Sequence, residues 1–296
     1  MILVTGASGF VGRNLVKELL RQNKKVRCFV RKTSGISQLK GAEIFYGDVT
    51  DKKSLVRATK GVSSVVHLAA ITGFGDYRLN YKVHVLGAEN LIETCKENNV
   101  KRIIDVSTVA TLAERKSDYG ITKALADDLF IKSGLSVTIL KPDFIYGPDG
   151  RGFLELVGAI KRRKIIPVVG HGNFIRYPVH VDDVVAAIIS SLNKKLSVGK
   201  TYVVASRMPL TFIAMVNKIM EKEGIKKPII RLPVWLVLFA AYFMRVRKNP
   251  KITKTIVLGI SQDRLIDTSS LTNELKVNPI SFDEGLKQSL KKLNKH

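Results

Sequence analysis

The first twelve residues, MILVTGASGFVG, constrain the fold more than any other stretch of the chain. The apolar run Ile2–Val4 predicts a buried strand, and an amphipathic helical pattern begins a few residues later. Of the three glycines between them, Gly6 permits a tight turn, Gly9 allows a pyrophosphate to approach the backbone, and Gly12 allows the helix to pack close to the sheet. The spacing is G-x-x-G-x-x-G, which an ordinary structural loop could also have. Its place between strand and helix favours a dinucleotide-binding turn, because the amino end of a helix attracts phosphates.

The first half of the chain alternates between short apolar runs and helical periods. The runs are continuously apolar, which is typical of parallel strands covered by helices on both faces. We therefore predict an α/β fold with a Rossmann-type, doubly wound parallel sheet that binds its ligands at the carboxyl ends of the strands. The strands expected after the first are Val26–Val30, Glu43–Tyr46, Ser64–Leu68, Arg102–Val106 and Val137–Leu140, and the expected helices are Val11–Arg21, Lys52–Ala58, Tyr81–Glu97 and Tyr119–Lys132.

The rhythm changes after Pro142, where turn-rich segments alternate with helical runs. This change predicts a smaller, mostly helical C-terminal lobe that covers the ligand edge of the sheet. We expect a nucleotide-binding domain over residues 1–165 and a substrate-binding lobe over residues 166–296, with the chain returning to the sheet at 176–204. The elements expected here are helices at Phe153–Arg163, Asp182–Leu192, Thr211–Glu223, Pro233–Val246, Ser269–Glu274 and Asp283–Leu293, and a strand at Thr201–Val204.

The charge balance indicates the kinds of partner that the chain can have. Its 296 residues carry 49 Lys and Arg against 25 Asp and Glu, a net charge of +24, which favours phosphates, nucleic acid or an acidic membrane surface. No basic stripe with interleaved aromatic residues occurs, so we expect no nucleic-acid partner, and a lysine-rich solvated surface is the simpler interpretation. Cys28 and Cys95 lack the spacing of metal ligands, so we expect no metal. Buried thiols and a strand that starts at residue 1 favour a cytoplasmic protein without a signal peptide.

Residues 234–244 form a segment that is apolar on all sides and is flanked by Arg231, Arg245, Arg247 and Lys248. Its eleven residues are fewer than the roughly 20 that span a bilayer. We favour a core or dimer helix, and a peripheral membrane contact or a lid over an apolar substrate are the alternatives.

The end of the second expected strand favours NADP as the cofactor, with NAD as the alternative. No Asp or Glu occurs between Glu18 and Glu43, so the acid that would bind a ribose 2′-hydroxyl is absent. Arg31 and Lys32 stand there instead, and such cations can pair with a 2′-phosphate, although Arg31 could also stack on adenine beside either cofactor. Asp48 ends the third strand, where its carboxylate can accept the adenine amino group.

Tyr119 and Lys123 carry the predicted chemistry. A spacing of four places both side chains on one face of a helix, and an ammonium lowers the pKa of a nearby phenol by favouring its charged form. Such a tyrosine can exchange a proton with a secondary alcohol or ketone while hydride moves at the carbon. The hydroxyls of Ser107 and Thr108, at the end of the fifth strand, could orient the substrate oxygen.

These motifs together resemble the extended short-chain dehydrogenases/reductases of the NAD-dependent epimerase/dehydratase family, which include 3β-hydroxysteroid dehydrogenases and dihydroflavonol reductases. The resemblance rests on TGASGFVG at 5–12, GDVTD at 47–51, HLAA at 67–70, GAENLIETC at 87–95, VST at 106–108, YGITK at 119–123, KPDFIYGPDG at 141–150 and RYPVHVDDVV at 176–185. It implies a nicotinamide cofactor and a catalytic set of Thr108, Tyr119 and Lys123. It also implies a homodimer that pairs through the helices Tyr81–Glu97 and Tyr119–Lys132. The implied cofactor contacts are Gly6, Ser8, Gly9, Phe10, Val11, Gly12, Arg31, Asp48, Val49, Leu68, Ala69, Ala70, Tyr119, Lys123, Pro142 and Ile145.

The departures from the family pattern concern the substrate. Phe144 and His84 stand where members that act on sugar nucleotides carry Asn, and the stretch between Thr108 and Tyr119 is short. Arg176 instead favours a sugar-nucleotide substrate, because it matches an arginine that binds the substrate diphosphate in the epimerases. With Ser107, Phe144 and Arg176 as substrate contacts, we expect an oxidoreductase for a bulky, partly apolar alcohol or ketone. The alternatives are a nucleoside-diphosphate-sugar epimerase or dehydratase, and a non-catalytic NADP-binding sensor or assembly factor.

Overall fold

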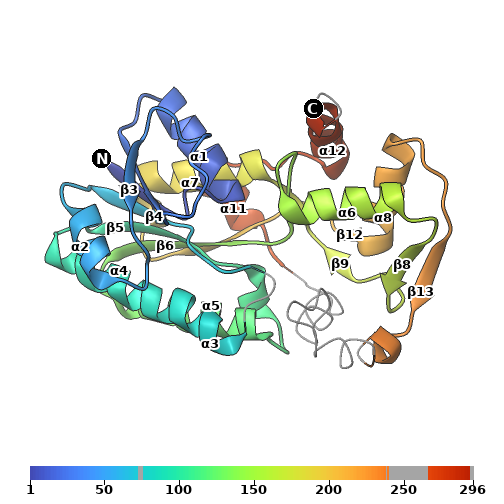
Figure 1. The fold of residues 1–296 in the computed structure, drawn as a ribbon, viewed down its shortest axis with the longest axis horizontal. Coiled ribbons are helices and arrows are strands. Elements are labelled where there is room, and N and C mark those ends of the chain that lie inside the picture. The colour runs from blue at the N-terminus through green and yellow to red at the C-terminus, as the bar shows by residue number, and fades with distance from the viewer. Residues whose placement is uncertain (73–75, 238, 240–265, 294–296) are drawn as a thin grey trace.

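A computed structural model of the chain describes residues 1–72, 76–237, 239 and 266–293. Its centre is a parallel sheet of seven strands in the order β11-β6-β5-β4-β1-β2-β3 (Figure 1). Crossovers on both sides of β1 give the doubly wound topology that the sequence predicts. The strands are β1 (Ile2–Thr5), β2 (Val26–Val30), β3 (Glu43–Tyr46), β4 (Ser64–His67), β5 (Arg102–Val106), β6 (Ser136–Pro142) and β11 (Thr201–Val204).

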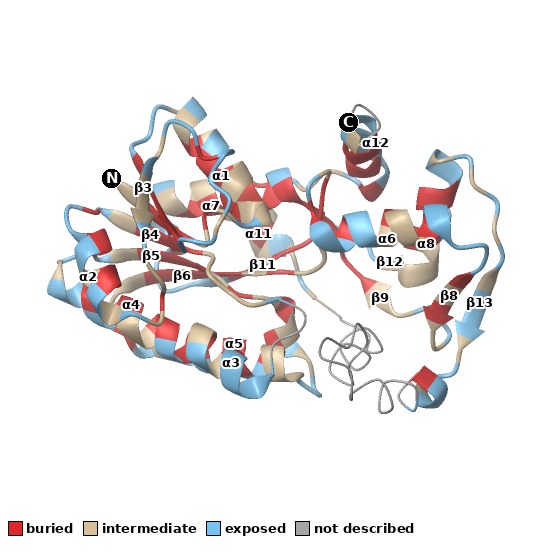
Figure 2. Cartoon of the chain, viewed as in Figure 1, coloured by how far each residue is buried: buried red, intermediate tan, exposed pale blue. Residues whose placement is uncertain are grey.

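Helices cover both faces of the sheet, and each face has its own apolar core (Figures 1 and 2). Neighbouring residues of β1 show the division, because Val4 belongs to one core and Leu3 to the other, and both are fully buried. Strands buried on both faces cannot alternate between apolar and polar residues, which explains their continuous apolar runs. One face carries α1 (Phe10–Arg21), α7 (Val181–Asn193) and α11 (Ser269–Asn273), and the other carries α2 (Lys52–Thr59), α4 (Gly87–Glu97) and α5 (Asp118–Lys132).

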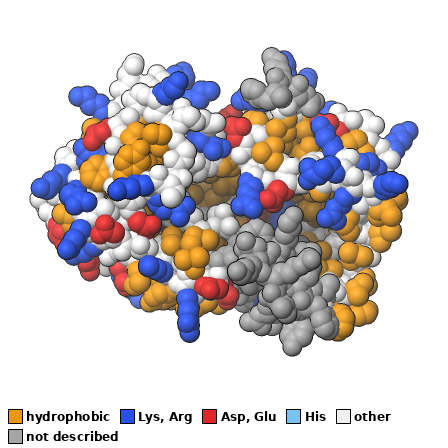
Figure 3. Space-filling model, viewed as in Figure 1, with side chains coloured by type: hydrophobic (Ala, Val, Ile, Leu, Met, Phe, Trp, Pro, Cys, Tyr) orange, Lys and Arg blue, Asp and Glu red, His pale blue; other side chains and the backbone are white. Residues whose placement is uncertain are grey.

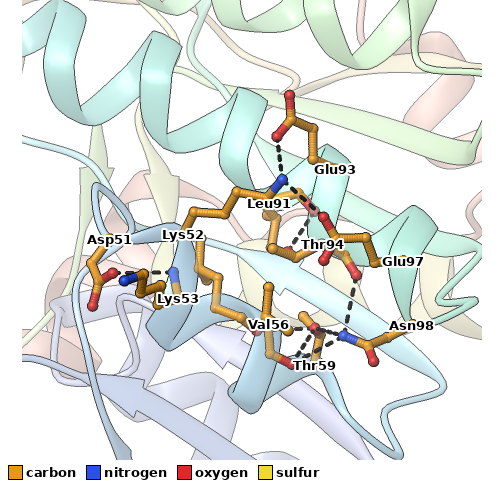
Figure 4. Close-up of polar contacts among 11 residues, drawn as sticks. Asp51, Lys52, Lys53, Val56, Thr59, Leu91, Glu93, Thr94, Glu97 and Asn98 are labelled. Atoms are coloured by element: carbon orange, nitrogen blue, oxygen red, sulfur yellow. Dashed lines mark hydrogen bonds and ion pairs between the residues drawn. The ribbon is translucent and has the colours of Figure 1, made fainter.

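Polar contacts join α2 to α4 at the edge of the second core (Figure 4). Lys52 Nζ lies 2.8 Å from a carboxylate oxygen of Glu93 and 2.8 Å from one of Glu97. The amide of Asn98 donates to the carbonyl of Val56 and to the hydroxyl of Thr59, at 3.0 and 2.8 Å. Exposed ion pairs contribute at most about 1 kcal/mol each, so the apolar core beneath supplies most of the stabilisation.

In the structure, the stretch predicted as one helix over Tyr81–Glu97 is made of three consecutive helical elements. A short helix, α3 (Tyr77–Tyr81), comes first, and a π-helical turn, η1 (Lys82–Leu86), joins it to α4. Apolar periodicity does not reveal a single π turn inside a helix, because its few residues are too short a stretch to define a period of their own. The π turn places His84 in the interior.

The second lobe is built on α6 (Arg151–Arg162), α8 (Phe212–Lys222) and α12 (Phe282–Leu293), which share a third apolar core. The sequence analysis missed its short strand pairs, most of which have only two residues and therefore no measurable period. They are β7 (Ile145–Tyr146) with β10 (Val179–His180), β9 (Ile175–Arg176) with β12 (Leu210–Thr211), and β8 (Ile166–Val169) with β13 (Ile229–Leu232). Between these elements, α7 and β11 return to the seven-stranded sheet.

Two features of the surface bear on the expected partners. Lys and Arg side chains are scattered over the visible face of both lobes (Figure 3). Among the described residues, no helix is long and apolar enough to cross a membrane. Most of the apolar segment 234–244 lies outside the described residues; of its described part, Trp235 is 69% exposed and Val237 is buried.

Candidate active site

The glycine turn leaves backbone exposed at the amino end of α1. Gly6 has a φ of +66°, and a Cβ atom there would lie 2.7 Å from the carbonyl carbon of Leu68. A Cβ atom at Gly12 would overlap the Gly6 carbonyl oxygen, so side chains are excluded from both positions. Gly9 is the N-cap of α1 and supplies no side-chain acceptor for the first amides of the helix. Those amides and the positive end of the helix dipole suit a phosphate group.

A hollow of about 200 Å³ lies beside this turn, along the carboxyl ends of β1, β2 and β4. Predicted cofactor residues that line it are Gly6, Ser8, Gly9, Arg31, Asp48, Val49, Leu68, Ala69 and Ala70. It is also lined by residues that the sequence analysis missed: Phe29, Val30, Ser34, Gly47, Ile71 and Val83. The position of Gly47 before Asp48 in a glycine-acid pair at a strand end was the available signal for it.

Other predicted cofactor residues lie around the hollow without lining it. The ring of Phe10 packs beneath the turn at residues 147–150, within 3.0 Å of where a Cβ atom at Gly147 would stand. Val11 and Ile145 pack against the core under α1, and Pro142 is buried at the end of β6. Any contact of these residues with a cofactor would therefore come mainly from their backbone or from the rim.

Arg31 and Asp48 both line the hollow, but they differ in their side-chain hydrogen bonds to described residues. The guanidinium of Arg31 is exposed and forms no hydrogen bond or ion pair with any described residue. One oxygen of Asp48 accepts bonds from the amide and the hydroxyl of Thr50, at 2.9 and 2.8 Å. Asp51, and not Asp48, caps α2 by accepting from the Lys53 amide.

The catalytic candidates meet at the carboxyl end of β5. Thr108 follows this strand, and its hydroxyl lies near enough to the phenol of Tyr119, at the start of α5, to lower the pKa of that phenol. Lys123 lies one helical turn further on, is 2% exposed, and donates through Nζ to the Val106 carbonyl at 3.1 Å. The hydroxyl of Ser107 is buried and has no hydrogen-bond partner among the described residues. The structure therefore brings these four side chains together, and the buried Ser107 hydroxyl among them lacks a hydrogen-bond partner in the described part of the chain, which is unusual for a buried polar group.

The ammonium of Lys123 acts on Tyr119 in the predicted direction, but it does not determine the net shift of the Tyr119 pKa. The pKa of Tyr119 is raised above its ordinary value, because burial disfavours the phenolate. Lys123 and the Thr108 hydroxyl act in the opposite direction, but the carboxylates Asp105 and Asp127 add to the rise. The sequence analysis considered the ammonium alone and missed both the burial and the two acids.

Comparisons with known proteins agree with this geometry. A family model described as "NAD dependent epimerase/dehydratase family" matches residues 2–205. The chain belongs to this family. It is 28% identical to sterol demethylase protein B of Methylococcus capsulatus over 94% of each chain. It is 23% identical to a 3β-hydroxysteroid dehydrogenase/decarboxylase of Arabidopsis thaliana over 97% of its own length, but spans only 61% of that relative.

A solved structure of the family shows the same fold at full length. UDP-glucose 4-epimerase from Thermotoga maritima, determined with UDP-glucose, superposes with a TM-score of 0.83 at 22% identity, over 99% of this chain and 98% of that one. An identity this low shows the fold alone. The family model and the named relatives establish an enzyme of the extended short-chain dehydrogenase/reductase type, an oxidoreductase of a family that binds a nicotinamide–adenine dinucleotide.

His84, which departs from the family's usual residue, has a defined role in the packing behind Tyr119. The Ile71 amide donates to its Nε2 at 3.1 Å, so the ring proton lies on Nδ1 and is donated to the Thr122 hydroxyl at 2.9 Å. Its ring meets the Tyr119 ring edge-on, with centroids 5.4 Å apart. Burial and the charge of Lys123 lower the pKa of His84 to about 4. A neutral imidazole therefore links the chain after β4 to the helix that carries the catalytic candidates.

The predicted substrate contacts Phe144 and Arg176 lie in the second lobe. Phe144 is half-buried against the third core, beside Gly152. Arg176 is 8% exposed in β9, and its Nη1 donates to the Ile175 carbonyl at 2.6 Å. Neither residue lines the hollow at the glycine turn.

Proposed function

We propose that the chain is an NADP-preferring oxidoreductase that transfers hydride at a secondary alcohol or ketone of a bulky, partly apolar substrate. The observation that carries the proposal is the cluster at the end of β5, where Thr108 and the buried ammonium of Lys123 both favour the ionised form of the Tyr119 phenol. This cluster stands at the same edge of the sheet as the glycine turn and its hollow. The arrangement suits proton transfer beside a bound dinucleotide.

Each residue has a separate task in this proposal. Tyr119 gives a proton to the substrate oxygen in reduction, or takes it in oxidation. The hydroxyls of Thr108 and Ser107 bind the same oxygen and stabilise the charge that develops on it. Lys123 keeps a positive charge below the phenol, which favours the phenolate as the proton leaves. The bound nicotinamide cofactor would supply or accept the hydride.

The preference for NADP rests on Arg31. Its guanidinium is unpaired among the described residues at the rim of the hollow, and no carboxylate ends β2. A 2′-phosphate placed there could accept hydrogen bonds from the guanidinium, whereas the ribose hydroxyl of NAD would find no acid to bind it.

The apolar substrate is supported by Phe144 and by relatives named for sterols. Arg176 favours the alternative, a nucleoside-diphosphate sugar, as in the neighbouring epimerase structure. The test is to incubate the purified protein with NADP⁺ and a panel of 3β-hydroxysterols and prenyl alcohols, and to follow NADPH absorbance. Turnover with the panel and no binding of UDP by calorimetry supports the proposal. Turnover of UDP-glucose without use of the apolar alcohols overturns it.

We further propose that the protein is a cytoplasmic homodimer with a nucleotide-binding domain and a substrate-binding lobe. The expected boundary at residue 165 moves ahead of α6 in this proposal, because α6 packs in the third core with α8 and α12. Exposed apolar side chains on η1 and α5 support pairing through these helices: Leu86, Ile121, Leu125 and Ile131. The exposed Trp235 supports a peripheral membrane contact near residue 235. Analytical sedimentation measures whether the protein is a dimer, and flotation with acidic vesicles measures whether it binds a membrane surface.

A further inference from the structure

Two carboxylates lie in the interior directly behind the catalytic lysine. Asp105, on the interior strand β5, has no exposed surface, and Asp127, on α5, is 3% exposed. Asp127 pairs with Lys141 Nζ at 2.9 Å. Asp105 has only Lys123 Nζ, 3.7 Å from its Oδ1, which is too long for a hydrogen bond. Both oxygens of Asp105 lack a hydrogen-bond partner among the described residues.

The position of Asp105 is unusual for a structural acid. Burying an ionised carboxylate costs several kcal/mol unless good hydrogen bonds and a close ion pair offset it, and Asp105 lacks these hydrogen bonds. Its neighbour in the register of β4 is His67, and its own strand continues with the catalytic hydroxyls of Ser107 and Thr108. An acid retained at such a cost, next to the reacting groups, is more readily explained by function than by stability.

The ionisable groups that face Asp105 come from each element around it. The strands contribute His67 and Lys141, and α5 contributes Tyr119, Lys123 and Asp127. Burial lowers the pKa of His67 to about 3, and its Nδ1 is bonded to the Thr5 hydroxyl at 2.8 Å, so this ring is neutral. The remaining charged groups are two lysines and two carboxylates, so the net charge of the cluster is zero.

Lys123 lies within this balanced cluster, in contact with Asp105 on β5 and close to Tyr119 on its own helix. Its Nζ is held against β5 by the Val106 carbonyl and by Asp105. The negative charge of Asp105 also reaches Tyr119, where it opposes formation of the phenolate. The same carboxylate thus fixes the ammonium in place and reduces its effect on the phenol.

We propose that Asp105 is a positioning residue that anchors the Lys123 ammonium and offsets its charge beside the Tyr119 phenol. The inference rests on the proposed function only in taking Tyr119 as the group that exchanges the proton. When the Asp105 charge is removed, the Val106 carbonyl still holds the ammonium, which then faces the phenol without compensation. Tyr119 should therefore ionise at lower pH.

The test follows the titration of Tyr119 directly and needs no substrate. The protein is labelled with 3-fluorotyrosine, whose phenol is more acidic than that of tyrosine, and is titrated by ¹⁹F NMR. Its eight tyrosines give separate signals, and Tyr119→Phe assigns the one of interest. We expect Asp105→Asn to lower the midpoint of this signal by about one pH unit. Asp105→Glu, which restores the charge, should return it toward the wild-type value.

Asp128→Asn is the matched control, because it removes one negative charge from the exposed side of the same helix and should leave the midpoint unchanged. Asp105→Ser serves as a second uncharged variant should the asparagine prevent folding, as judged by circular dichroism. An unchanged or higher midpoint in a folded, uncharged variant overturns the inference. Because the titration does not depend on turnover, a protein that reduces no ketone could still show the shift, which separates this inference from the proposed function.

Discussion

The hollow at the glycine turn and the cluster at the end of β5 are built in opposite ways. The hollow depends on the absence of side chains, since Gly6 and Gly12 leave backbone amides accessible at the start of α1. The cluster depends on buried charge, with Lys123, Asp105 and Asp127 all at most 3% exposed. The first is therefore sensitive to added volume and the second to altered charge or lost hydroxyls. The two regions respond to different substitutions, and the following predictions use that difference.

The largest effect should come from removing the phenol of the cluster. Tyr119→Phe should reduce kcat/KM by about 10²–10⁴-fold, because proton transfer to the substrate oxygen is lost. NADPH affinity should change little, because the hollow lies on the other elements. Steady-state kinetics and calorimetry measure both quantities, with the exposed Tyr77→Phe as control. Full activity in Tyr119→Phe would support the non-catalytic sensor instead.

The buried histidine behind the cluster should make stability depend on pH. The folded protein lowers the pKa of His84 from 6.5 to about 4, so it favours the neutral ring. This contribution is fully present above pH 6.5 and is lost as the pH falls toward 4, by up to about 3 kcal/mol. In His84→Asn the free energy of unfolding, measured with urea at pH 7.5 and pH 5, should therefore fall less between the two values.

The exposed His171→Asn is the control for this experiment, and it should retain the pH dependence of the wild type. Only the difference between the two pH values is compared, because His84→Asn also loses the hydrogen bonds to Ile71 and Thr122. Equal pH dependence in His84→Asn and the wild type would contradict the buried, neutral ring.

Added volume at the glycine turn should damage the hollow and spare the cluster. A Cβ atom at Gly12 would overlap backbone atoms of Gly6 and Ala7, so Gly12→Ala should lower the free energy of unfolding by about 1–3 kcal/mol and abolish NADPH binding. Gly35→Ala is the control, since a Cβ atom there meets nothing within 4 Å. Normal NADPH affinity in Gly12→Ala would mean that the cofactor binds elsewhere.

The smallest effect should distinguish the two cofactors. Arg31→Ala should weaken NADPH binding about tenfold, which corresponds to one charge-assisted hydrogen bond, and should leave NADH binding nearly unchanged. Lys40→Ala is the control, because it removes the same charge from an exposed position that does not line the hollow. Calorimetry measures the affinities of the wild type and of Arg31→Ala for NADPH and for NADH. An equal loss of affinity for both nucleotides would indicate that Arg31 stacks on adenine.

The contrast also explains which parts of the molecule the sequence could predict. The turn at Gly6 and the strands around it are local patterns, so their spacing predicted the sheet and many of the residues that line the hollow. The balance of charge behind Tyr119 is not local, because Asp105 comes from β5, Asp127 from α5 and Lys141 from β6. An acid inside the apolar run that precedes Ser107 and Thr108 was the one available signal. Two-residue strands such as β9 and β12 gave no period to detect.

The central claim is that the Tyr119 phenol faces the nicotinamide ring of a dinucleotide bound on the opening glycine turn. A crystal structure of the protein with NADP⁺ tests it most directly. We predict that the pyrophosphate lies on the first amides of α1 and that the nicotinamide ring lies within contact distance of the Tyr119 hydroxyl. A dinucleotide bound away from Gly9, or a ring separated from Tyr119 by other side chains, would contradict the assignment.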